Sequence, residues 1–189
     1  MVTVYFVRHA LPDHPPGVPD GDRPLSREGL TDRALALELL RDRPVDGFYC
    51  SPYRRSLETI APAAEFFHLE IAIDPRLRER TGGREAKGDL ARRWADFDFH
   101  EPDGECLRSV QDRNVAALLE ILDANEGKAL VLGTHGTALS AILNYFRPER
   151  GLEDFLRIVN WMPWILEARF EGHALVRLTE LGHLCKEVT

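Results

Sequence analysis

Two histidines occupy equivalent places in this sequence, and imidazole can act as a nucleophile or bind an anion. His9 directly follows an apolar, β-branched segment, Val2–Val7, and His135 follows another, Lys128–Gly133. Both segments read as buried strands. Because ligands of parallel sheets bind beyond the carboxyl ends of the strands, we expect the two imidazoles to converge there. A single histidine after a strand is more often a packed or exposed residue, so this pair alone identifies no site.

Two arginines extend this pair into a candidate pocket for a phosphoryl group. Arg8 directly precedes the first histidine, and Arg55 follows Ser51-Pro52, a signal for a helix start. That helix follows a predicted strand, so its N-terminus should face the same edge and favour anions. Guanidinium groups match the geometry of phosphate oxygens. The alternative for Arg54 and Arg55 is a solvated basic turn paired with Glu58.

The elements that must position these residues alternate between strands and helices. Further strands are expected at 45–50 and 70–74, a hairpin at 164–170 and 174–178, and helices at 26–41, from 51, 109–125 and 137–145. This order predicts an α/β fold with a mainly parallel sheet. Residues 1–189 should form a single domain, and the irregular stretch at about 80–105 should be an inserted, lid-like segment.

Composition limits the partners. The chain has 189 residues, a formal net charge of -7 and three cysteines without metal-ligand or redox spacing. An acidic protein is a poor match for nucleic acid or an anionic membrane surface, although local arginines can still bind a phosphorylated metabolite. The sparse cysteines and an apolar start too short for a signal peptide favour the cytoplasm. No histidine cluster indicates a metal or cofactor, and nothing in the sequence indicates the oligomeric state.

A series of short motifs resembles the histidine phosphatase superfamily, branch 1, also called phosphoglycerate mutase-like. The signatures RHG, LTxxG and SPxxRAxQT correspond to Val7–Ala10, Leu25–Gly29 and Ser51–Thr59. The signatures LxE…G and GGES…R correspond to Leu77–Glu79 with Gly83 and to Asp103–Cys106 with Arg113. The signature SHG corresponds to Thr134–Gly136 and the family's C-terminal tail to Leu181–Leu184, so the order of the motifs is kept. Each motif is weakly specific by itself, but their ordered combination covers nearly the whole chain.

The resemblance implies a phosphoglycerate mutase-like three-layer α/β sandwich and a role for each matched residue. His9 would become phosphohistidine, and Arg8, Arg55 and His135 would bind the phosphoryl oxygens. Glu79 would protonate the leaving oxygen and then activate water. Such chemistry depends on positioning and charge neutralisation, so arginines would serve without a metal or cofactor.

Three departures from the family pattern bear on these roles. Ala10 replaces the glycine of RHG, and Glu58 replaces a glutamine one helical turn from the motif arginine. There Glu58 would either orient that arginine or repel a highly charged substrate. The segment after the acid also differs, so Asp13 and Glu85 are rivals of Glu79 as proton donor.

Three functions fit this reading. The first is metal-independent hydrolysis of a small phosphomonoester through phosphorylated His9. The second is a phosphoglycerate-type mutase that uses the same intermediate, and the third is a non-catalytic phosphate-recognising protein. Mutases of this family tend to be longer, so the short chain favours hydrolysis.

Overall fold

The computed structural model describes residues 1–82 and 89–187, so Gly83 and Glu85 lie outside the described residues. Six strands form one sheet in the order β3-β2-β4-β1-β5-β6. They are β1 (Val2–Arg8), β2 (Gly47–Cys50), β3 (Ile71–Ile73), β4 (Ala129–Thr134), β5 (Trp161–Glu171) and β6 (Ala174–Cys185). The first four are parallel, and the β5–β6 hairpin is antiparallel. The predicted α/β fold with a mainly parallel sheet is confirmed.

The helices differ from the predicted ones mainly at their ends. They are α1 (Arg27–Asp32), α2 (Ala34–Leu40), α3 (Arg54–Phe67), α4 (Leu90–Ala95), α5 (Leu107–Ala124), α6 (Gly136–Phe146) and α7 (Leu152–Ile158), with 3-10 turns η1 (Asp20–Asp22) and η2 (Pro75–Leu77). The helix expected at 26–41 is divided at Arg33, whose guanidinium donates to the carbonyl of Glu58. The third helix begins at Arg54 rather than at Ser51-Pro52, and Ser51 Oγ accepts the Tyr53 amide at 3.2 Å just before it.

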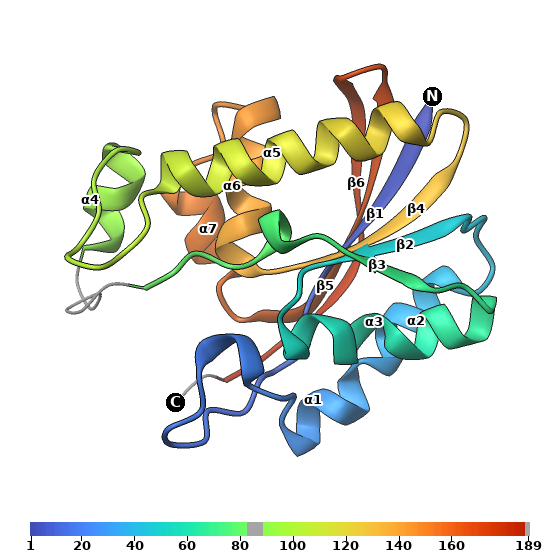
Figure 1. The fold of residues 1–189 in the computed structure, drawn as a ribbon, viewed down its shortest axis with the longest axis horizontal. Helices are drawn as coiled ribbons and strands as arrows, with labels where there is room; N and C mark the ends of the chain where they lie inside the picture. The colour runs from blue at the N-terminus through green and yellow to red at the C-terminus, as the bar shows by residue number, and fades with distance from the viewer. Residues whose placement is uncertain (83–88, 188–189) are drawn as a thin grey trace.

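Helices cover both faces of the sheet and make three layers (Figure 1). Side chains alternate along β1, as the pleat of a strand requires. Val4 and Phe6 lie in a core with residues of α5, α6 and α7. Tyr5 and Val7 lie in a second core with residues of α2 and α3. Strand β1 is therefore buried on both faces, which explains its continuous apolar run.

Three parallel strands end at the same level. Arg8 of β1 pairs with Thr134 of β4, and Cys50 of β2 pairs with Gly133 of β4. The ladder continues one residue further, where the His9 amide donates to the Thr134 carbonyl at 3.1 Å. The sheet therefore brings three chain segments together at one edge, where ligands of such sheets bind.

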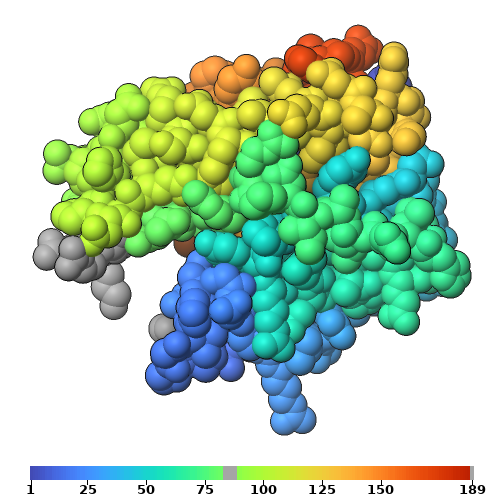
Figure 2. All heavy atoms as spheres, viewed as in Figure 1, coloured from blue at the N-terminus to red at the C-terminus, as the bar shows by residue number. Residues whose placement is uncertain are grey.

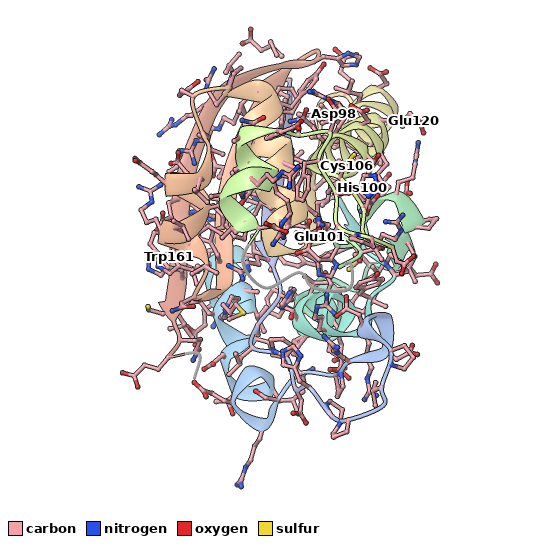
Figure 3. The ribbon with its side chains drawn as sticks, turned by 90° about the vertical axis from the view of Figure 1, so that its left-hand side faces the viewer. Asp98, His100, Glu101, Cys106, Glu120 and Trp161 are labelled. Carbon is pink, nitrogen blue, oxygen red and sulfur yellow. The ribbon has the colours of Figure 1, made fainter. Side chains whose placement is uncertain are left out.

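The described part of the 80–105 segment is fixed to the body of the protein. Within the segment, Glu101 is 2% exposed and forms ion pairs with Arg80 and Arg93. Glu105 pairs with Arg113 of α5 at 2.8 Å. The Trp94 ring of α4 lies 5.6 Å from the Phe155 ring of α7. Figure 3 shows Glu101 beneath α4, with Trp161 on the side of the β5–β6 hairpin. A lid function for this segment, and the single-domain assignment, stay predictions. Within the described ranges, no helix has the length and apolarity needed to cross a membrane.

Candidate active site

His9 is held as a neutral imidazole with a defined tautomer. Its ring is buried, and Nδ1 lies 2.7 Å from the Ala10 carbonyl oxygen, which can only accept. Nδ1 therefore carries the hydrogen, and Nε2 keeps a lone pair. Nε2 accepts from Arg55 Nε at 3.3 Å. Burial, and then the charges of Arg55 and Arg8, hold the pKa of His9 well below its ordinary value.

His135 lies next to His9 at the start of α6. The two ring centroids are 5.2 Å apart, and His135 is fully buried. Its Nε2 lies 2.6 Å from Ser51 Oγ, which accepts the Tyr53 amide and can donate its own hydrogen to Nε2, so that the ring hydrogen is on Nδ1. The buried Nδ1 has no hydrogen-bond partner among the described residues. Burial and the nearby His9 lower the pKa of His135 well below the ordinary value. Sequence reasoning interpreted Ser51 only as a helix cap and missed this contact.

Arg8 is a buried cation with one donor left over. Its Nη1 and Nη2 donate to the carbonyls of Ile158 and Val159 at 2.5 and 2.9 Å. Its Nε is buried and has no partner in the described part of the chain. Burial lowers the pKa of Arg8 to about 10, against the opposing charge of Glu79. Arg8 Nε and His135 Nδ1 are thus two unsatisfied polar atoms beside one imidazole, and a missing acceptor explains both.

Arg55 projects from the first turn of α3 into the same place. It is 4% exposed, and its guanidinium carbon lies 4.9 Å from the centroid of the Tyr53 ring. Both terminal nitrogens contact the carboxylate of Asp20, each at 3.2 Å. Neither Tyr53 nor Asp20 was predicted, because no motif identifies which loop residues reach a distant side chain.

The expectation that Glu58 orients Arg55 is wrong. Glu58 instead accepts from Arg54 Nε at 2.7 Å and from the Leu25 amide at 2.7 Å. Both the i,i+3 and the i,i+4 spacing allow such an ion pair, and the structure pairs Glu58 with the i,i+4 neighbour. The solvated basic turn therefore describes Arg54, whose side chain is 57% exposed, and not the buried Arg55.

Glu79 lies where α6 begins. Its carboxylate accepts the amides of Thr137 and Ala138, both at 3.0 Å, and that of Arg80 at 2.8 Å. It also lines a pocket of about 420 Å³ with Asp20, Arg23, Tyr53, Arg55, Arg80, Thr81 and Gly82. Figure 2 shows a hollow at this end of the molecule, between the blue N-terminal loop and the green segment. The rival Asp13 is exposed and accepts from the next amide, that of His14.

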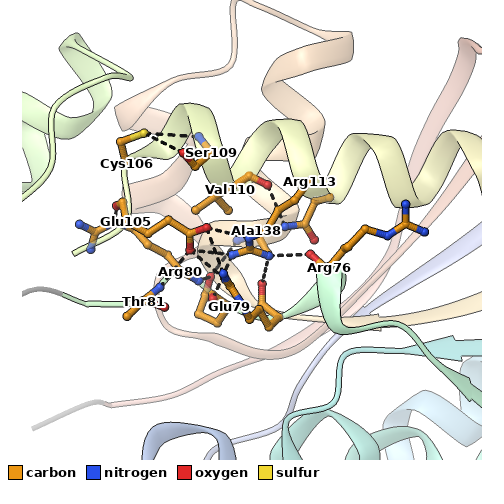
Figure 4. Close-up of polar contacts among 12 residues, drawn as sticks. Arg76, Glu79, Arg80, Thr81, Glu105, Cys106, Ser109, Val110, Arg113 and Ala138 are labelled. Carbon is orange, nitrogen blue, oxygen red and sulfur yellow. Dashed lines mark hydrogen bonds and ion pairs between the residues drawn. The ribbon is translucent and has the colours of Figure 1, made fainter. Parts of the chain in front are cut away.

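An arginine of α5 fixes the chain that carries Glu79 (Figure 4). Arg113 donates to the carbonyls of Arg76 and Arg78, each at 2.6 Å, and to that of Glu79 at 3.1 Å. The same guanidinium pairs with both carboxylate oxygens of Glu105 at 2.8 Å. Arg113 thus positions the backbone of Glu79 without touching its carboxylate.

Comparisons with known proteins identify the family. The profile described as the histidine phosphatase superfamily (branch 1) matches residues 4–178. The chain belongs to this superfamily. A Hydrogenobacter thermophilus protein provisionally named phosphoserine phosphatase 2 is 29% identical, with 97% of this chain and 98% of that protein aligned. An Enterobacter protein provisionally named phosphoglycerate mutase GpmB is 28% identical over 76% of this chain and 74% of that one.

Solved structures of the superfamily share the fold of this histidine phosphatase. A phosphoserine phosphatase mutant from Entamoeba histolytica, crystallised with phosphoserine, superposes with a TM-score of 0.75 at 20% identity, covering 97% of this chain and 100% of that one. A mycobacterial glucosyl-3-phosphoglycerate phosphatase gives a TM-score of 0.73 at 20% identity, covering 94% and 96% of the two chains. The recognition of the family from ordered motifs is confirmed.

The two neutral histidines should make this histidine phosphatase sensitive to acid. Because the pKa of His9 is lowered by folding, the unfolded chain binds more protons below about pH 6.5, and the free energy of unfolding falls as the pH decreases. We expect wild type to lose about 1 kcal/mol more than His9→Gln between about pH 7.0 and 5.5. Urea unfolding at the two pH values measures this difference, and equal losses would contradict a neutral His9.

Removal of the Arg113 side chain should impair catalysis through Glu79. We expect Arg113→Gln to lower kcat on the order of tenfold, because a small misplacement of a reacting group is costly, and to change KM little. The pH profile of kcat should shift with it, which a purely structural loss would not cause. Arg76→Gln is the matched control, since that side chain pairs with Glu120 at the surface. Equal effects of the two substitutions on kcat would exclude a positioning role.

Proposed function

We propose that this protein is a phosphatase that hydrolyses a small phosphomonoester through a phosphohistidine on His9. The observation that carries the proposal is the pair of buried, unpartnered atoms, Arg8 Nε and His135 Nδ1, beside a neutral imidazole. Phosphoryl oxygens would accept from both. Membership of the histidine phosphatase superfamily supports the same chemistry.

In the proposed first step, His9 Nε2 attacks phosphorus in line with the ester oxygen. The new N–P bond forms as the P–O bond to the alcohol breaks, and Glu79 gives its proton to the leaving oxygen. Three backbone amides donate to this carboxyl group and hold it in place at the start of α6. Arg8, Arg55 and His135 neutralise the charge on the transferred group.

In the proposed second step, water attacks the phosphohistidine. The N–P bond breaks, the Glu79 carboxylate takes a proton from the water, and inorganic phosphate leaves. Because Nδ1 keeps its hydrogen on the Ala10 carbonyl throughout, Nε2 regains the lone pair with which it began. The residues therefore return to their starting protonation states after each turnover.

Hydrolysis of para-nitrophenyl phosphate in the presence of EDTA tests this proposal. We expect EDTA-resistant turnover, and a phosphorylated protein after rapid quenching whose label survives alkali and is lost in acid, as a phosphoramidate requires. Well-folded protein that forms no phosphohistidine with any phosphomonoester would overturn the proposal.

The relatives suggest the first physiological substrates to assay. The relative whose name includes phosphoserine phosphatase aligns over almost its full length, so phosphoserine is the leading substrate candidate. The similarity to GpmB keeps a mutase as the second candidate function. Release of inorganic phosphate from phosphoserine would support hydrolysis. Interconversion of phosphoglycerates without release of phosphate would instead support the mutase.

A further inference from the structure

The guanidinium of Arg55 already holds an anion that belongs to the protein. Asp20 places Oδ1 on Nη1 and Oδ2 on Nη2, each at 3.2 Å. The third nitrogen, Nε, donates to His9 Nε2. Every nitrogen of Arg55 therefore has an internal partner. Nη1 uses both of its hydrogens on Asp20, whereas Nη2 keeps one, so phosphoryl oxygens can bind both terminal nitrogens only after the Asp20 carboxylate leaves.

The carboxylate of Asp20 can move away from Arg55 without displacing the arginine. Its side chain is 41% exposed, whereas that of Arg55 is 5% exposed. The Asp20 backbone carbonyl accepts from Arg55 Nη1 at 2.6 Å, so the turn η1 still holds the arginine when the carboxylate departs. Arg23 Nη1, at 2.9 Å from Asp20 Oδ1, offers the departing carboxylate a second cation. The carboxylate is thus the exchangeable member of this group.

We propose that Asp20 is a specificity-determining residue, whose carboxylate occupies the terminal nitrogens of Arg55 in the free enzyme and is displaced by the phosphoryl group of the substrate. This inference rests on the proposed function, which brings phosphoryl oxygens to the same nitrogens. Asp20 takes no part in bond making, and it determines which anions bind to the site more favourably than its own carboxylate does.

The displacement selects phosphoryl groups over carboxylates. A monocarboxylate that replaces Asp20 exchanges one singly charged, two-oxygen ligand for another and gains little. A phosphoryl dianion brings a second charge and a third oxygen, which can satisfy the unpartnered Arg8 Nε and His135 Nδ1. The phosphoryl group therefore binds more hydrogen-bond donors than the Asp20 carboxylate does, whereas a monocarboxylate does not.

Binding of inorganic phosphate, measured by calorimetry at low ionic strength, tests the proposal. Asp20→Asn removes the charge and keeps the backbone carbonyl and the size of the side chain. We expect this variant to bind phosphate on the order of fivefold more tightly than wild type, a modest gain because the displaced pair is partly exposed. Asp22→Asn is the matched control: it removes the same charge from the same turn at an exposed position, and its affinity should equal that of wild type.

Acetate as a competitor tests the selectivity. It should weaken phosphate binding to Asp20→Asn at lower concentrations than to wild type, because the internal carboxylate no longer excludes it. Unchanged or weaker phosphate binding in Asp20→Asn would show that Asp20 supports Arg55 and would overturn the inference alone. Absence of phosphate binding in wild type and in both folded variants would overturn the proposed function as well.

Discussion

Replacement of His9 by alanine is expected to abolish turnover of para-nitrophenyl phosphate, with a loss of at least about 10⁴-fold, because it removes the proposed phosphoryl acceptor. Nε2 of His9 carries a lone pair at neutral pH, since Nδ1 holds the hydrogen and the pKa is lowered. The neighbouring His135 is not expected to substitute, because Ser51 engages its Nε2 at 2.6 Å and its Nδ1 donates to the phosphoryl group in the proposed mechanism. Steady-state rates in EDTA measure the loss directly.

A loss in His9→Ala must be separated from a failure to fold, because the replaced ring is buried. Circular dichroism and phosphate binding serve this purpose, since Arg8, Arg55 and His135 are intact in the variant. His14→Ala is the matched control, because that imidazole is exposed on the following loop, and its rate should equal that of wild type. Substantial turnover by folded His9→Ala would refute the covalent route and leave direct attack by water as the mechanism.

The second large effect is expected at Arg55. Arg55→Ala should lower kcat/KM by about 10²–10³-fold, as does the loss of a donor to a developing oxyanion. This residue is 4% exposed and contacts His9, so in the proposed mechanism it would act both on the phosphoryl group and on the nucleophile. Removal of its charge should also raise the pKa of His9 toward the ordinary value, since that charge is among the causes of the lowering. The acid side of the pH–rate profile should therefore move to higher pH.

The next residue in the chain supplies the control for Arg55. Arg54 has the same side chain and a neighbouring position on α3, but it is 57% exposed and pairs with Glu58. Arg54→Ala should leave kcat/KM within about twofold of wild type, as is usual for an exposed ion pair. A similar loss in both variants would indicate that general positive charge, and not the guanidinium beside His9, drives catalysis.

The sequence was informative where one apolar pattern decides a structure. The runs before His9 and His135 become neighbouring buried strands, and their common edge follows from the parallel order. It was uninformative where a loop residue reaches across the fold, as Asp20 does to Arg55. It was misleading at Glu58, because two arginines in succession offered partners and spacing alone could not choose between them.

The segment that carries Glu79 could also be predicted only in part from the sequence. The motif indicated Glu79, but nothing local indicates that its carboxylate would accept amides from α6. That arrangement depends on Arg113 of α5, which binds three carbonyls of the segment. Arg113 matched a family motif, but its contacts with this irregular backbone follow no periodic pattern, so its role is seen only in the folded structure.

The contact between Arg8 and Gly136 has a consequence for how this sequence can evolve. A methyl group at Gly136 would lie 3.0 Å from the guanidinium carbon of Arg8, so the buried arginine occupies the space of the missing side chain. In a library randomised at both positions and selected for turnover, the two would not vary independently. A larger residue at 136 would survive only with a smaller one at 8, which could not supply the buried charge. Arg8 and Gly136, which lie far apart in the sequence, are therefore expected to be retained together in such a selection.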